Sequence, residues 1–147
     1  MKIGIMLMLM MSFFSCQATE LSGECQTKLR VHKELTGGKE NLLILDMAVE
    51  FLDEQQILFF LEGSTTLQEK TYTISRYLTF TYSKKADDFY SLKRVSIEKF
   101  SSDNYPDENF TEQFGIDAER PLIHISKLKN HYIFANEFSP IFICIAS

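Results

Sequence analysis

Most of this sequence alternates between apolar and polar residues with a period of two, which is typical of strands with one buried face. The pattern is clearest over residues 70–83, where threonines occupy much of the other face, as is common on an exposed sheet surface. The apolar residues that share one face of this segment are Tyr72, Ile74, Leu78, Phe80 and Tyr82. Residues 41–52 repeat the pattern, although their Leu, Met, Ala and Glu content leaves a helix as the alternative.

Further strands are expected at residues 26–32, 55–62, 89–100, 122–128, 132–134 and 141–145, with polar turns between them. A bulge near Lys93-Arg94 would reconcile the two parities of residues 89–100, and residues 63–68 are interpreted as a polar connection. A short helix near residues 107–115, capped by Asp107, interrupts the series. The sequence predicts an all-β, mainly antiparallel domain of about seven or eight strands, either a sandwich or a barrel-like meander.

The first residues form a separate segment: Lys2, an apolar run over residues 3–11, and then small polar residues, the layout of an export leader. Small residues at Cys16 and Ala18 predict a signal peptide over residues 1–18. Alternatively, a lipoprotein leader spans residues 1–15 with Cys16 lipidated, or the segment stays uncleaved as an inner-membrane anchor. In each case residues 19–147 form a single β-rich extracytoplasmic domain, periplasmic or membrane-anchored and facing the periplasm.

Cysteine usage depends on this leader. With Cys16 removed or lipidated, Cys25 and Cys144 remain, and an even pair in an oxidising compartment predicts a disulfide. Two unpaired buried thiols are the alternative. No metal site is expected, because the three histidines are neither spaced as a motif nor close to the cysteines in sequence.

Chemical signatures are weak elsewhere. The net charge of −5 disfavours binding to nucleic acid, and no catalytic or cofactor motif is present, so we expect no enzyme and no cofactor. Asp46 and Glu50 would share a strand face as solvated carboxylates. Lys84-Lys85 and Lys93-Arg94 are interpreted as a solvated, charged sheet edge, with a small basic patch across a hairpin as the alternative.

Phenylalanine is abundant, with 13 residues, and its distribution leaves two interpretations open. Five phenylalanines on the predicted strands would either pack as a core or line a cavity for an apolar ligand, as in small β-barrels. These residues are Phe51, Phe59, Phe80, Phe134 and Phe142.

The chain resembles the FidL-like family of small enterobacterial envelope proteins. The resemblance lies in the leader, Cys25, and three stretches: residues 72–82 (YTISRYLTFTY), 125–134 (ISKLKNHYIF) and 139–144 (SPIFIC). It implies an exported β domain whose ends are joined, and it supplies no activity or catalytic residues. We therefore expect a non-enzymatic envelope accessory protein that binds an envelope protein partner through a strand edge. The alternative is a small β-barrel that binds a lipid or another apolar ligand.

Overall fold

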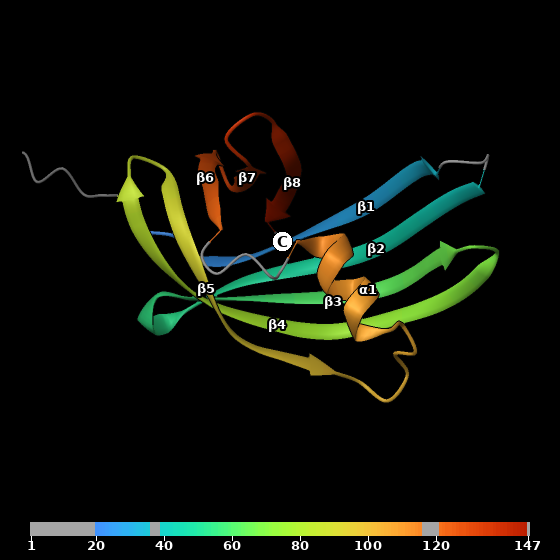
Figure 1. Ribbon diagram of the computed structural model, residues 1–147. Coiled ribbons are helices and arrows are strands. Elements are labelled where there is room, and N and C mark those ends of the chain that lie inside the picture. Colours follow the sequence, from blue (N-terminus) through green and yellow to red (C-terminus); the bar gives the residue numbers. More distant parts are fainter. Residues whose placement is uncertain (1–19, 36–38, 116–120, 147) are drawn as a thin grey trace, which may run out of the picture.

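Eight antiparallel strands follow one another around a closed barrel, and the last strand pairs back with the first (Figure 1). The computed structural model describes residues 20–35, 39–115 and 121–146. The predicted all-β class is therefore confirmed, and of the two predicted architectures the barrel is the observed one. The backbone pairing of β1 with β8 decides this, because a sandwich would leave both strands as edges.

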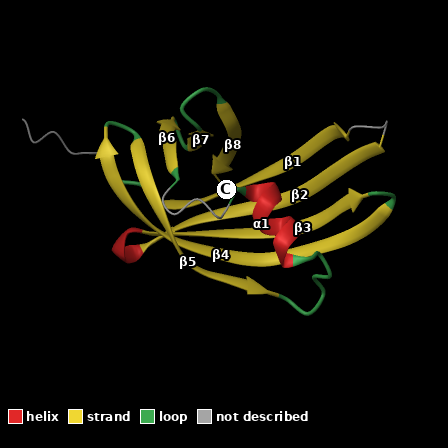
Figure 2. Cartoon of the chain, viewed as in Figure 1, coloured by secondary structure: helices red, strands yellow, loops and turns green. Residues whose placement is uncertain are grey.

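Five long strands form most of the wall: β1 (Gly23–Leu35), β2 (Lys39–Leu52), β3 (Gln56–Leu67), β4 (Lys70–Ala86) and β5 (Phe89–Lys99). Three short strands complete it: β6 (Leu122–Leu128), β7 (His131–Ala135) and β8 (Pro140–Ala146). A 3₁₀ turn, η1 (Asp53–Gln55), joins β2 to β3, and the helix α1 (Asp107–Phe114) lies between β5 and β6 in sequence (Figure 2).

The period-two pattern places the core inside the barrel, as the sequence predicts. On β2, Asp46 and Glu50 are exposed, whereas the residues at odd positions point inward. Those buried residues are Leu43, Leu45, Met47, Val49 and Phe51. Residues 41–52 are therefore a strand and not the alternative helix.

The predicted polar connection at residues 63–68 is wrong, because β3 continues to Leu67. Gly63 pairs with Leu45, and a Cβ at Gly63 would overlap the carbonyl oxygen of Ile44, so glycine permits the close approach of β2 and β3. The chain reverses instead at Gln68 and Glu69, which both have positive φ, as a two-residue type I′ hairpin requires. Neither residue is the usual Gly or Asn, so the sequence signal for this turn is weak.

Two other local predictions shift by one residue. The bulge in β5 falls at Val95, between the Arg94–Phe80 and Ser96–Thr79 pairs, one position after the predicted site. The helix is observed as expected, but Pro106 is its N-cap and Asp107 is its first helical residue. Gly115, with a φ of 61°, ends the helix in the left-handed conformation.

The barrel is not closed evenly along its length. β5 and β6 share three residue pairs, and β8 meets β1 at only two, Cys25–Ala146 and Gln26–Ile145. Figure 1 shows β1 to β4 running on beyond β8, with α1 placed against this longer part of the wall. The short strands therefore leave a wedge-shaped opening between β1 and β8.

Candidate functional site

A disulfide stands at the narrow end of this wedge. Cys25 and Cys144 are both fully buried, their Cα atoms are 5.3 Å apart, and they are separated by 119 residues in sequence. The structure thus contains the bridge predicted from the sequence. It joins the first strand to the last beside their two residue pairs, and it indicates an oxidising, extracytoplasmic location.

Beyond the disulfide the wedge widens into a groove of about 570 Å³ between β1, α1 and β8. Its lining is mainly apolar, with polar groups contributed by α1 and the end of β2. Val31 and Ile141, on opposite sides of the opening, are about half exposed. The apolar residues of this groove are Leu29, Val31, Leu43, Leu67, Phe114 and Ile141.

A buried ion pair holds α1 and the loop before it in place as the groove's wall. Arg76 and Asp103 are 2.8 Å apart (Nε to Oδ2) with both side chains almost fully buried, and a second guanidinium nitrogen donates to Asp103 Oδ1 at 3.1 Å. Arg76 Nη1 also lies 2.9 Å from Asp107, the first residue of α1, and the guanidinium sits 4.1 Å from the ring centroid of Phe110. The helix is therefore fixed to the inner face of β4 by charge as well as by packing.

The environment of Asp103 keeps this carboxylate ionised. Burial alone would raise the pKa of Asp103, but the positive charge of Arg76 and three sets of hydrogen bonds to the ionised carboxylate together outweigh it. They come from Arg76 and from the backbone N–H groups of Ser75 and Tyr105, at 2.9 Å each for the backbone donors. The pKa of Asp103 is consequently held below its ordinary value.

Sequence reasoning missed Arg76, although a signal was present. Its position has the same parity as Ile74 and Leu78, so on a regular strand its side chain must point to the apolar side. A lone charge on an apolar face requires a buried counter-charge. The acid that provides it, Asp103, lies 27 residues later in a loop whose course the pattern does not reveal.

The groove also contains an unpaired polar atom. The side-chain oxygen Oδ1 of Asn41 is buried and has no hydrogen-bond partner among the described residues. Asn41 lies near the N-terminal end of β2 on the inward side, in the same row as Leu43 and Leu45. Because Oδ1 is shielded from solvent, a ligand N–H in the groove would reach it only if the Asn41 side chain rotated, and a hydrocarbon chain offers no such donor.

The five candidate phenylalanines pack against one another inside the barrel. Ring-centroid distances are 4.5 Å between Phe134 and Phe142, 5.8 Å between Phe59 and Phe80, and 6.1 Å between Phe59 and Phe134. Phe51 stacks on Phe134 at 6.5 Å. These contacts are those of aromatic core packing, and the rings are distinct from the groove lining, to which none of the five contributes.

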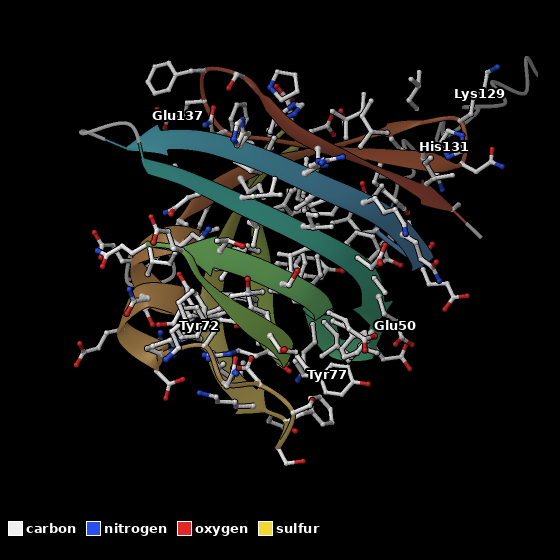
Figure 3. All side chains as sticks on the ribbon, turned by 90° about the vertical axis from the view of Figure 1, so that its right-hand side faces the viewer. Glu50, Tyr72, Tyr77, Lys129, His131 and Glu137 are labelled. Carbon is white, nitrogen blue, oxygen red and sulfur yellow. A yellow bond between two sulfur atoms is a disulfide. The ribbon has the colours of Figure 1, made fainter. Side chains whose placement is uncertain are left out.

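The other residues that the sequence singles out are dispersed. Asp46 pairs with Lys28 across β1 and β2, with 2.9 Å between Nζ and Oδ1 and both side chains exposed. Glu50 lies four residues further along the same face, about 13 Å away at 3.3 Å per residue, and Figure 3 shows it at the far end of β2. Paired carboxylates of glycosidases are separated by about 5–9.5 Å, so this spacing does not match theirs.

The alternative basic patch on β4 and β5 does not form. Lys84 pairs with Tyr90, whereas Lys93 and Arg94 pair with Thr81 and Phe80 nearer the middle of β4, so the two basic pairs do not face each other. In the described ranges no three His, Cys, Asp or Glu side chains are grouped as metal ligands. Cys16 and the predicted leader, residues 1–18, lie outside the described residues.

Two further findings bear on the chain's place among known proteins. No helix in the described part of the chain is both long enough and apolar enough to span a membrane. A family model described as "FidL-like putative membrane protein" matches residues 63–144, which cover β4 to β7, α1, the last part of β3 and most of β8. No curated protein matches the sequence.

Proposed function

The chain belongs to the FidL-like putative membrane protein family, and from this premise we propose that it is a non-enzymatic, exported accessory protein of the envelope that binds a protein partner. The observation that carries the proposal is the incomplete seam between β1 and β8. On the β8 side, β1 has no paired strand after Gln26 among the described residues. An unpaired strand edge is the feature to which extended segments of other proteins bind by adding a strand.

The disulfide supports the exported location. A bridge between cysteines is stable in an oxidising compartment and rare in the cytosol. In this proposal the leader carries the domain to the periplasm, where it remains soluble or stays associated with the inner membrane through its N-terminus. Alkylation of free thiols in intact cells, followed by reduction and mass spectrometry, should show Cys25 and Cys144 protected together.

Partner binding is tested by photo-cross-linking in the native envelope. A photoreactive phenylalanine analogue replaces Val31, which lines the groove and is 48% exposed. The matched control replaces Val95, an exposed valine of β5 that is 57% exposed and lies outside the groove. We expect one discrete protein adduct from position 31 and none of that mass from position 95. If both positions yield the same adducts, or neither yields any, the proposal is wrong.

A second candidate function is binding of a lipid or another apolar ligand, favoured by the apolar lining of the groove. The protein purified from its native envelope would then carry the ligand. Extraction with organic solvent and mass spectrometry should recover it in stoichiometric amount, and Leu29→Asp should abolish its retention.

A further inference from the structure

The free edge of β1 has a definite length. β8 pairs with Cys25 and Gln26 and then diverges, so residues 27–35 lack a strand on that side in the described structure. At about 3.3 Å per residue this edge is about 30 Å long, enough for an added strand of five to nine residues. The disulfide closes one end of the opening, so an incoming strand must enter from the wide end.

The two faces of this edge differ in chemistry. Leu29 and Val31 line the groove, and Thr27 lies in the same inward-facing row of β1. Lys28 and Arg30 are exposed on the outward side. A strand added to β1 therefore meets an apolar surface with every second side chain and a basic surface with the others.

Charge argues against a second copy of this chain as the occupant. Two β1 strands paired antiparallel about Leu29 would place Lys28 directly opposite Arg30 of the other copy, and like charges in that position are destabilising. Lys28 is already paired with Asp46 on β2, whereas Arg30 forms no ion pair with any described residue. A strand with acidic outward residues would complement Arg30.

The polar atom in the groove favours a peptide over a hydrocarbon chain. The shielded Oδ1 of Asn41 lacks a donor, and a peptide brings N–H groups from which Oδ1 could accept if the Asn41 side chain rotated toward the groove. Glu112 and Gln113 of α1 add polar atoms on the opposite wall.

We propose that the wedge between β1 and β8 binds an extended segment of the partner protein in which apolar residues alternate with acidic ones. The segment adds to β1 as a strand, with its apolar residues in the groove and its carboxylates toward Arg30. This inference rests on the proposed function and specifies the chemistry of the partner.

The test uses the full chain with its disulfide intact and a fluorescent nine-residue peptide that alternates glutamate with valine and isoleucine. Fluorescence anisotropy should show saturable binding. A peptide of the same composition with its glutamates in one block, and one with alternate backbone nitrogens methylated, should bind at least tenfold more weakly. Equal binding of the block peptide or the methylated peptide would overturn the inference.

Charge reversal tests the orientation. Arg30→Glu should weaken binding of the alternating acidic peptide about fivefold or more and should strengthen binding of the corresponding lysine peptide. Lys129→Glu is the matched control, because Lys129 lies in the turn between β6 and β7, away from Tyr72 and the α1 side of the barrel (Figure 3). Similar losses in both variants would show attraction by net charge alone and would overturn the inference.

Asn41→Leu separates a peptide from an apolar ligand. Loss of the hydrogen-bond acceptor should weaken binding of the peptide about fivefold, whereas binding of a fluorescent fatty acid should be unchanged or stronger. A fatty acid that binds in the groove and displaces the peptide completely would support the lipid alternative and overturn the inference. The Arg30→Glu and Asn41→Leu variants must keep the disulfide and the wild-type circular dichroism spectrum.

The cross-linking experiment distinguishes two negative results: a partner whose binding segment differs from the test peptide, and the absence of any protein partner. An adduct from position 31, without binding of any alternating peptide, retains the partner and overturns only its proposed chemistry. If sedimentation shows a dimer that forms through β1, the occupant is a second copy and this inference is also overturned.

Discussion

Removal of the Cys25–Cys144 disulfide should cost a large share of this domain's stability. The bridge joins residues 119 positions apart, so it constrains almost the whole described chain in the unfolded state. The loop-entropy relation, with an entropy of about −2.1 − 1.5R ln n cal/mol/K, gives about 5 kcal/mol at 25 °C for a loop of this length. Small domains typically have about 5–15 kcal/mol of stability in total, so the loss is a third or more of it, and a domain at the low end of this range would unfold on reduction.

The structure adds a reason for the loss to be concentrated at the seam. β1 and β8 share only two residue pairs, and without the bridge little else holds β8 against β1. If the reduced protein stays folded, hydrogen exchange should therefore increase first in β7 and β8. The long hairpins from β1 to β5 have many more residue pairs and should remain protected.

Urea unfolding of the oxidised protein, the reduced protein and the double variant Cys25→Ala/Cys144→Ala measures this loss. At an m-value of about 1.5 kcal/mol/M the midpoint should fall by about 3 M, with m fitted separately for each form because a cross-linked unfolded chain exposes less surface. Similar losses on reduction and in the double variant attribute the effect to the cross-link. A loss below about 1 kcal/mol on reduction would refute the entropic argument.

Three other predictions concern the interior. Asp103→Asn leaves the Arg76 guanidinium buried without its counter-charge, so the free energy of unfolding should fall by about 3–5 kcal/mol; a urea titration showing less than about 1 kcal/mol would contradict this. The lowered pKa of Asp103 contributes stability that is present above its ordinary pKa of 3.8 and is lost as the pH falls through the lower folded-state value. Wild-type stability should therefore decrease in acid below about pH 4, and a comparable acid slope in Asp103→Asn would show that another group is responsible. Gly63→Ala places a Cβ against the carbonyl oxygen of Ile44, so we expect a loss of about 1–3 kcal/mol, and wild-type thermal stability would show that β2 moves away without cost.

The sequence alone determined which segments contain strands and which face of a regular strand is buried. Period-two alternation depends only on which side of a pleated strand each side chain occupies, so the inward row of β2 could be predicted from the residues. The bounds of β6, Leu122–Leu128, match the prediction, and the helix at Asp107–Phe114 falls within its predicted range. The cysteine pairing was predicted from the expected leader and the count of thiols, both of which were inferred from the sequence.

Tertiary structure decided the features that depend on how distant segments meet. The close approach of β2 and β3 at Gly63, and the positive φ angles at Gln68 and Glu69, extend β3 through a stretch whose composition suggests a connection. Arg76 finds its counter-charge in a loop 27 residues away. No local pattern encodes these meetings, because each depends on the twist and curvature of the assembled sheet.

The groove is the clearest case of this division. The short lengths of β6, β7 and β8 are visible in the sequence, but the pairing of β8 with only two residues of β1 is a consequence of how these short strands close the barrel. Alternation in residues 26–32 predicts one apolar and one polar row on β1, and it is the divergence of β8 that leaves both rows beside an open edge. The apolar and basic side chains of this edge were therefore predictable from the sequence, whereas the exposure of the edge depends on how β8 meets β1 in the barrel.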